Sequence, residues 1–415
     1  MQKFFTNLEL NSGFVKNFHY LCRVIQREII EKIKLMATKM PVISVTGPRQ
    51  SGKTTLTKMC FPHYDYVNLE NPDTLEDAKS DPRLFLARHK YGLIIDEIQL
   101  YPALFSYIQT ISDKNNQAGE FILTGSQNFL LSEKISQSLA GRVFITHLLP
   151  FSFSELQSAD YELSDFSKSI FKGFYPRVYD KSIEPTMFYP SYIQTYTERD
   201  LRQILNVSNL FLFQKFMRLV AGRVGQILNY SSIATELGID LKTVKSWFSI
   251  LETSFVVFFL QPHFQNFSKR LLKTPKLYFY DTGLVCSLLG IKKQEDIDLH
   301  WAKGALFENM IVADLMKNYY NRAETPPLYY WRDNTGNEID CLIEDSNLIK
   351  SVEIKSSTTV HQDFFKGLNF YKKLNECSEQ YLVYGGNDSV QRKEAQIVAW
   401  NNTKNIIEKS KNACM

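Results

Sequence analysis

The residues best suited to chemistry form a glycine-rich segment, GPRQSGKTT, at positions 47–55. It follows an apolar run at 42–45 and leads into a predicted helix. Glycines at such positions let backbone N–H groups approach phosphate oxygens without a side-chain clash. The lysine can reach the β- and γ-phosphates, and the next hydroxyl can bind Mg²⁺. The segment therefore predicts a phosphate-binding P-loop, to which we assign Gly47, Pro48, Arg49, Gln50, Ser51, Gly52, Lys53, Thr54 and Thr55.

A pair of carboxylates follows another apolar run further along the chain. Residues 93–95 lead directly into Asp96 and Glu97, about 40 residues after the P-loop, where nucleotide enzymes usually place such a pair. Asp96 can hold Mg²⁺ through its water shell, together with the Thr54 hydroxyl. Glu97 can orient and deprotonate an attacking water molecule. The spacing therefore predicts hydrolysis of a nucleoside triphosphate.

Two further polar positions are candidates for the same site. Ser126, with Thr124 as second choice, follows the apolar run at 121–123 and could position water beside the γ-phosphate. A hydroxyl that caps the next helix is an equally good interpretation. Arg142 could neutralise charge that develops on the γ-phosphate, within the subunit or from a neighbouring one. A structural ion pair or a solvated arginine is the alternative, so both candidates stay open.

The elements that must position these residues are short apolar runs separated by helical stretches. They lie at 42–45, 66–69, 93–95, 121–123 and 143–148. This alternation is the signature of a parallel α/β sheet, whose strands end at one common edge. Apolar residues at helical spacing before residue 38 predict that a helix, from about Phe14 onward, precedes the sheet.

Composition narrows the class of protein. The chain has 415 residues, 44% of them hydrophobic and 22% charged, and a net charge of +4. These are values of a soluble globular protein, and the mild charge permits contact with nucleic acid without arguing for it. The scattered cysteines form no CxxC pair, which indicates reduced thiols in a cytoplasmic protein. The most apolar run, 255–260, is too short to span a bilayer, so no membrane partner is expected.

Residues 230–252 fit a helix-turn-helix. Ser231 or Ser232 is expected to cap the first helix, Gly238 to make the turn, and Asp240 to cap the second helix. These are the residue types that two crossing helices need at such positions.

The apolar runs at 255–260 and 276–280 could add a wing to this motif. Lys242, Lys245 and Trp247 lie on its second helix. DNA contact through them is open, but a lid or packing role is favoured, because small winged-helix modules serve these purposes as well.

A second constellation lies in the C-terminal third. Glu308 is on a predicted amphipathic helix, and residues 338–355 alternate as a β-hairpin that carries Asp340, Glu353 and Lys355. The turn places Asp340 opposite residue 352 or 353, and Glu353 and Lys355, two apart, share a face. Such carboxylates bind Mg²⁺, with Asp340 and Glu353 as the metal candidates, and the lysine polarises water. This is the arrangement of a metal-dependent phosphodiesterase; an exposed hairpin with a surface Glu–Lys pair is the alternative.

Together these features predict an α/β protein with a P-loop NTPase parallel sheet, a helical region and a nuclease-like α/β domain. The predicted domains, in order, are an N-terminal helical extension at 1–38, a P-loop ATPase domain at 39–160, a helical lid and winged-helix region at 161–295, and the nuclease-like domain at 296–415.

The ordered set of motifs resembles a widespread prokaryotic family of AAA-type ATPases with an uncharacterised C-terminal domain. The matching segments are GPRQSGKTTL, LIIDEIQ, ILTGSQ, LAGRVFITHLLPFSFSEL, YTERD, KGALFENMIVADL, YWRDNTGNEIDCLIE and VEIKSS. The resemblance implies ATP binding and hydrolysis by Lys53, Thr54, Asp96 and Glu97. It also implies a restriction-endonuclease-like C-terminal fold with Glu308, Asp340, Glu353 and Lys355 in the motif positions. It supplies no substrate.

Two functions from different classes follow. In the first, ATP hydrolysis controls a metal-dependent nuclease domain that acts on DNA. In the second, the protein is a nucleotide switch whose C-terminal domain only binds nucleic acid or protein. ATP and Mg²⁺ are the expected cofactors in both, and a homo-oligomer or a protein partner stays open.

Overall fold

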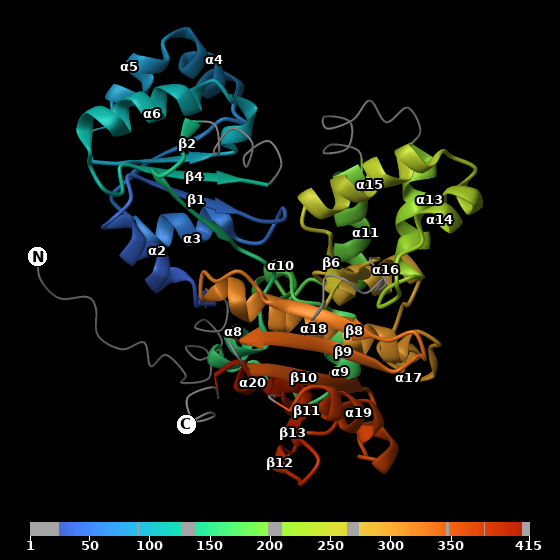
Figure 1. Cartoon of the computed structure of the whole chain (residues 1–415). Helices are drawn as coiled ribbons and strands as arrows, with labels where there is room; N and C mark the ends of the chain where they lie inside the picture. Colours follow the sequence, from blue (N-terminus) through green and yellow to red (C-terminus); the bar gives the residue numbers. More distant parts are fainter. Residues whose placement is uncertain are drawn as a thin grey trace, which may run out of the picture.

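The protein is built around two β-sheets, one in each half of the chain (Figure 1). One sheet has five strands and the other has eight. The computed structural model describes residues 25–89, 91–126, 138–197, 210–263, 274–345, 348–376 and 378–408. The predicted α/β class is confirmed.

The first sheet is entirely parallel, in the order β2-β3-β4-β1-β5. Its strands are β1 (Val42–Thr46), β2 (Asp65–Asn68), β3 (Leu93–Asp96), β4 (Phe121–Gly125) and β5 (Val143–His147). Every predicted apolar run became one of these strands. The strand β4 separates β1 from β3, so the segments that follow these three strands meet at one edge of the sheet.

Helices cover both faces of this sheet, as Figure 1 shows. Ile43, Ile94 and Ile122 face the helices α2 (Ile30–Ala37) and α3 (Lys53–Cys60). Residues such as Leu93 and Leu123 face the other way, and they pack against α4 (Pro72–Ser80), α5 (Pro82–Ala87) and α6 (Leu104–Asn115). The central strands β1, β3 and β4 are buried on both faces, which is why they are the most apolar, whereas the edge strands β2 and β5 are partly exposed.

The start of the chain departs from the prediction. The helix expected from Phe14 onward falls partly outside the described residues, and within them α2 begins only at Ile30. Residues 25–29 precede it without regular structure, although Ile25 and Ile29 are buried. The apolar stripe therefore belongs to a buried approach segment and a short helix.

A helical region follows the first sheet. Its helices are α8 (Phe153–Ser158), α9 (Phe166–Lys172), α10 (Pro176–Asp180), α11 (Pro185–Thr195), α13 (Leu210–Ala221), α14 (Tyr230–Leu237), α15 (Leu241–Thr253), α16 (Thr282–Leu289) and α17 (Asp296–Leu299). The helices α14 and α15 form the predicted pair, with Gly238 at φ 66° between them and Asp240 capping α15. Asn229, rather than Ser231 or Ser232, caps α14. Trp247 is buried against Phe213 and Phe216, so it is not exposed for DNA contact.

The strands predicted as a wing belong to the second sheet. The strands β6 (Val257–Pro262) and β7 (Lys276–Phe279) pair with each other, but β6 also pairs with β8 (Leu328–Arg332). The second sheet therefore has the order β12-β13-β11-β10-β9-β8-β6-β7. Its remaining strands are β9 (Glu338–Asp345), β10 (Leu348–Lys355), β11 (Ser378–Tyr384), β12 (Val390–Gln391) and β13 (Gln396–Ala399).

The second sheet is mixed and carries helices on both faces. The helix α18 (Lys303–Asn321) packs on one face and α19 (Lys366–Leu374) on the other, while α20 (Lys404–Glu408) lies beside α18. One hydrophobic core continues from the helical region into α18 and this sheet. The predicted boundary at residues 295 and 296 thus divides the sequence but not the core. No described helix has the length and apolarity that a membrane crossing requires.

A buried arginine joins the P-loop to the segment that leads into α8. Arg27 is 7% exposed and donates to the Glu155 carboxylate (2.8 Å), to Ser51 O (3.0 Å) and to Leu149 O (2.6 Å). Glu155, which is fully buried, also accepts from the backbone N–H groups of Glu28 and Ser152. Both charged groups of the Arg27–Glu155 ion pair therefore have several hydrogen-bond partners, which a buried ion pair needs in order to be stable.

We expect Arg27→Met to destabilise the fold by about 3 kcal/mol, because it leaves the buried Glu155 carboxylate without its counter-charge. Arg88→Met is the matched control, since the Arg88–Asp77 pair has side chains 49% and 43% exposed and should cost less than about 1 kcal/mol. The urea midpoint of the first unfolding transition measures both losses. Equal losses in the two variants would contradict a bridging role for Arg27.

Candidate functional site

The P-loop has the backbone geometry that phosphate binding requires. A Cβ atom on Gly47 would lie 2.1 Å from Leu148 O, and Gly52 has φ 94°, so neither position accepts another residue without strain. Ser51 is buried, and α3 begins at Lys53. Lys53 Nζ donates to Gly47 O (2.9 Å) and Pro48 O (2.8 Å). The ammonium group therefore lies inside the curve of the loop, at the N-terminus of a helix.

Asp96 is the centre of a hydrogen-bond network at the sheet edge. Its Oδ2 accepts from Thr54 Oγ1 (2.6 Å) and from the Tyr66 hydroxyl (2.9 Å), and its Oδ1 accepts from Thr124 Oγ1. Burial, and then the Asp96 charge, raise the pKa of Tyr66, so this hydroxyl remains a donor. Strands β2, β3 and β4 and helix α3 thus all fix the position of this carboxylate.

Thr54 and Asp96 fit a magnesium ion. They are hard oxygen donors, one neutral and one anionic, and they already lie within hydrogen-bond distance of each other beside Lys53. Mg²⁺ prefers such ligands and keeps most of its remaining positions for water and phosphate oxygens. These residues would hold the ion against the phosphates of a bound nucleotide.

Glu97 is held in an unusual backbone conformation. Its φ is 55°, in the left-handed region, which a non-glycine residue adopts at a cost of about 1 kcal/mol. Its carboxylate accepts from Gln99 Nε2 and from Ser126 Oγ (3.3 Å). Ser126 thus touches the candidate base, whereas Thr124 bonds Asp96. The alternative that Ser126 caps the following helix concerns residues outside the described part.

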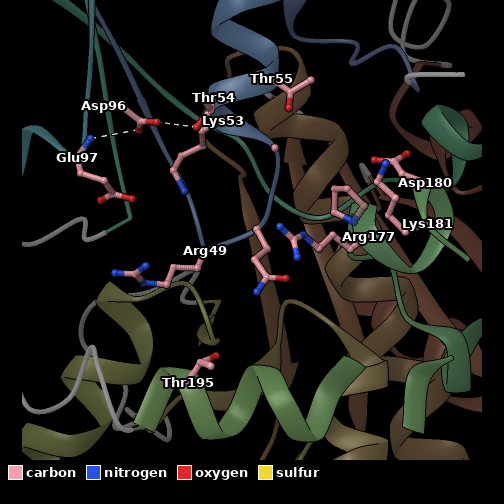
Figure 2. Close-up of a pocket in the computed structure, with 13 residues that line it drawn as sticks. Arg49, Lys53, Thr54, Thr55, Asp96, Glu97, Arg177, Asp180, Lys181 and Thr195 are labelled. Atoms are coloured by element: carbon pink, nitrogen blue, oxygen red, sulfur yellow. Dashed lines mark hydrogen bonds between the residues drawn. The ribbon is translucent and has the colours of Figure 1, made fainter. Parts of the chain in front are cut away.

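These side chains open into a cleft of about 680 Å³, within the range of small-molecule sites. Figure 2 shows Lys53, Asp96 and Glu97 on one side and Arg177 on the other. The far wall comes from α10 and the end of α11, and it consists of Pro176, Arg177, Asp180, Lys181 and Thr195. Arg49 and Gln50 of the P-loop complete the lining.

The sequence analysis missed this second wall. Arg177 lies in the segment KGFYPR, which reads only as a turn, about 120 residues after the P-loop. It reaches the cleft because the residues just before α10 pair with the segment that Arg27 ties to the P-loop: Phe151 N donates to Phe174 O (2.9 Å). Two basic residues four positions apart, Arg177 in the first turn of α10 and Lys181 at its C-cap, were the available signal.

Arg142 lies away from the cleft. It precedes β5, and Val42 N donates to its carbonyl oxygen, so it is at the sheet edge opposite the P-loop. Its guanidinium group makes an ion pair with Asp113 at the end of α6. Within one subunit the structure therefore does not bring Arg142 to the phosphates, and a role toward a neighbouring subunit stays a prediction.

The C-terminal candidates do converge. The register of β9 with β10, Val352 opposite Cys341, places Asp340 beside Glu353. Lys355 Nζ lies 2.6 Å from Glu353 Oε1 and 3.7 Å from Asp340 Oδ2. Burial, and then the Asp340 charge, raise the pKa values of both Glu353 and Glu308. The four predicted residues therefore share one electrostatic environment.

Two residues of β7 complete this group and were not predicted. Lys276 Nζ lies 3.2 Å from Glu308 Oε1 and also contacts Glu338, and the Tyr278 hydroxyl donates to Glu308. We call Lys276, Glu308, Glu338, Asp340, Glu353 and Lys355 the C-terminal ion cluster. No motif marks Lys276, because β7 lies before α16 in the chain and has the pattern of a wing strand.

The C-terminal ion cluster does not fit a metal ion as it stands. Within the described ranges, no three His, Cys, Asp or Glu side chains are arranged to hold one. Glu308 is turned toward β7 by Lys276 and Tyr278, whereas Asp340 and Glu353 lie around Lys355. The role of Asp340 and Glu353 as magnesium ligands stays a prediction.

Family comparisons divide the chain into three matched segments. Residues 39–157 match an AAA domain, residues 163–295 a domain of unknown function (DUF8612), and residues 303–403 another domain of unknown function (DUF4143). The chain therefore contains an AAA domain followed by two domains of unknown function. An AAA domain implies ATP binding, in agreement with the P-loop geometry.

Similar proteins are themselves uncharacterised. An uncharacterised protein of Mycobacterium tuberculosis is 28% identical over 347 residues, with 81% of this chain and 76% of the relative covered. One of Methanocaldococcus jannaschii is 23% identical over 364 residues, with 78% and 76% covered.

Solved structures with detectable similarity include a Walker-type ATPase of Pyrococcus abyssi. It has a TM-score of 0.42 and 11% identity, with 64% of this chain and 96% of that chain covered. AMPPCP-bound DnaA from Aquifex aeolicus has a TM-score of 0.30 and 13% identity, with 54% and 86% covered.

We expect Lys53→Ala to abolish ATP binding, because the phosphates lose the cation that the P-loop places at its centre. Lys114→Ala, an exposed lysine at the end of α6, is the control and should bind ATP as the wild type does. Isothermal titration calorimetry measures the affinities, and circular dichroism confirms that both variants are folded. Unchanged affinity in Lys53→Ala would refute the assignment of the P-loop.

Proposed function

We propose that this protein is a Mg²⁺-dependent ATPase. The observation that carries the proposal is the 2.6 Å hydrogen bond between Thr54 and Asp96, which brings the P-loop and the end of β3 together at the mouth of one cleft. A helix N-terminus, a lysine, a hydroxyl and two carboxylates in this arrangement serve phosphoryl transfer better than any other chemistry.

Each residue has a role in this proposal. The backbone of residues 47–55 surrounds the phosphates, and Lys53 exchanges its two carbonyl partners for phosphate oxygens. Thr54 and Asp96 hold Mg²⁺, which neutralises charge between the β- and γ-phosphates. Glu97 takes the proton of the attacking water, with Ser126 fixing the carboxylate.

The second wall of the cleft suggests how hydrolysis is linked to the rest of the chain. Arg177 and Lys181 are cations that face the P-loop from α10 and the segment after it. Positive side chains here attract the triphosphate and draw α10 toward it, because charge-assisted contacts strengthen as water leaves the cleft. Loss of the γ-phosphate would relax this contact.

For the C-terminal domain we favour the non-catalytic role, binding of nucleic acid or protein. The supporting observation is that the carboxylates of the C-terminal ion cluster are paired with Lys276 and Lys355. A metal-dependent nuclease needs these oxygens for its ions. DNA cleavage is the competing hypothesis.

Glu97→Gln is expected to bind ATP with near-normal affinity. It should hydrolyse ATP at least roughly 10²-fold more slowly than the wild type, since an amide cannot accept the proton of water. Phosphate release at saturating ATP measures the rate. Glu76→Gln, on the exposed surface of α4, is the control and should leave the rate unchanged. Turnover near that of the wild type in Glu97→Gln would remove Glu97 from the role of base, and a wild-type protein without ATPase activity would overturn the proposal.

The role of the C-terminal domain is tested by incubating the protein with ATP, Mg²⁺ or Mn²⁺, and linear, circular, single-stranded and nicked DNA. We expect ATP hydrolysis without cleavage, and the same result for Asp340→Ala, because the cluster offers no assembled metal site. Cleavage by the wild type that is lost in Asp340→Ala would instead establish the nuclease.

A further inference from the structure

Lys276 occupies the interior of the C-terminal ion cluster. The residue is 3% exposed, and its ammonium group contacts the carboxylates of Glu308 and Glu338. Burial lowers its pKa, but Glu308, Asp340 and Glu338 raise it more, so the group is charged at neutral pH. A buried lysine thus supplies positive charge where β9, β10 and α18 bring acidic side chains together.

The arrangement around Lys276 explains why Glu308 stays apart from the other acids. Glu308 Oε1 accepts from Lys276 Nζ and from the Tyr278 hydroxyl, both on β7. These bonds hold the carboxylate toward β7, whereas Asp340 Oδ2 accepts from Ile354 N (2.8 Å) on β10. Without the ammonium group, Glu308 has one bond fewer to β7 and an unbalanced charge beside Asp340.

Glu353 provides an independent sign that the acids of the cluster can bind a cation once Lys276 is removed. It is 9% exposed, and its Oε2 atom is buried without a hydrogen-bond partner, while Oε1 contacts Lys355. A buried carboxylate oxygen without a partner is costly, and either a proton or a cation relieves that cost. Carboxylate oxygens from Glu308, Asp340 and Glu353 are the hard ligands that Mg²⁺ and Mn²⁺ prefer.

We propose that Lys276 is the built-in cation of the C-terminal ion cluster: it balances the acidic side chains that would otherwise bind a divalent ion, and its removal converts the cluster into a Mg²⁺ or Mn²⁺ site. This inference rests on the non-catalytic role proposed above for the C-terminal domain. It adds that the ammonium group of one β7 residue, Lys276, stands in for a divalent ion and holds Glu308 toward β7.

The experiment compares the nucleotide-free full-length wild type with Lys276→Ala. Free Mn²⁺ is followed by electron paramagnetic resonance. Only the binding that is lost when the same protein also carries the Asp340→Asn substitution is counted. We expect no Asp340-dependent binding in the wild type. Lys276→Ala should gain Asp340-dependent Mn²⁺ binding. Its affinity for Mn²⁺ should exceed any such affinity of the wild type at least roughly tenfold, equivalent to about 1.4 kcal/mol. Excess Mn²⁺ should also raise the melting temperature of Lys276→Ala more than that of Lys276→Ala/Asp340→Asn.

Lys276→Gln extends the test, since its amide can still donate to Glu308 but carries no charge. This variant should bind Mn²⁺ more weakly than Lys276→Ala but more tightly than the wild type. Asp340-dependent binding by the wild type would overturn the inference. So would absence of binding in folded Lys276→Ala, or failure of both variants to fold even with excess Mn²⁺, because the metal should supply the missing charge. The non-catalytic role itself fails only if the wild type cleaves DNA, so the two failures are distinguishable.

Discussion

The guanidinium group of Arg27 is the contact on which the assembly of the ATP site depends. It touches the P-loop at Ser51 O, the segment after β5 at Leu149 O, and the Glu155 carboxylate in the first turn of α8. The P-loop and the segment at 149–155, about 100 residues apart, are therefore fixed by one planar donor. Phe151 N in this segment donates to Phe174 O (2.9 Å), just before α10, so the same segment also supports the wall that carries Arg177.

The segment that Arg27 contacts also packs against the C-terminal half. Phe153 N, in the first turn of α8, donates to Asp314 of α18 (2.8 Å), and Lys317 donates to Phe151 O (3.1 Å). At the end of β5, His147 bonds Thr46 (2.6 Å) and packs against Tyr320 of α18. Burial lowers the pKa of His147 to about 4, so the imidazole carries no charge in this contact at neutral pH. Packed and hydrogen-bonded contacts thus run from the strand before the P-loop to the helix that carries Glu308, a physical route for coupling.

Local pattern was enough to predict the first sheet and its site. The three central runs became strands because a strand buried on both faces needs apolar residues, and parallel strands must bring Thr54, Asp96 and Thr124 to one edge. The same reasoning failed where tertiary pairing decides. The run at 276–279 has the composition of any short strand, and only its pairing with β6 makes it part of the second sheet. Tyr66 and Arg177 were missed because neither lies in a motif; each reaches its partner through the packing of separate elements.

The two groups of charged residues in this chain differ in what holds their lysines. In the P-loop, Lys53 Nζ donates to the carbonyl oxygens of Gly47 and Pro48, and such bonds can be exchanged for phosphate oxygens. In the C-terminal ion cluster, Lys276 and Lys355 are bonded to carboxylates, and any ligand that takes either lysine leaves a buried acid without its counter-charge. The first arrangement favours an incoming anion, and the second opposes both anions and cations. Residue types alone do not distinguish these cases, since each contains lysine beside aspartate and glutamate; the distinction comes from the backbone carbonyls that only the tight turn at Gly47 can present.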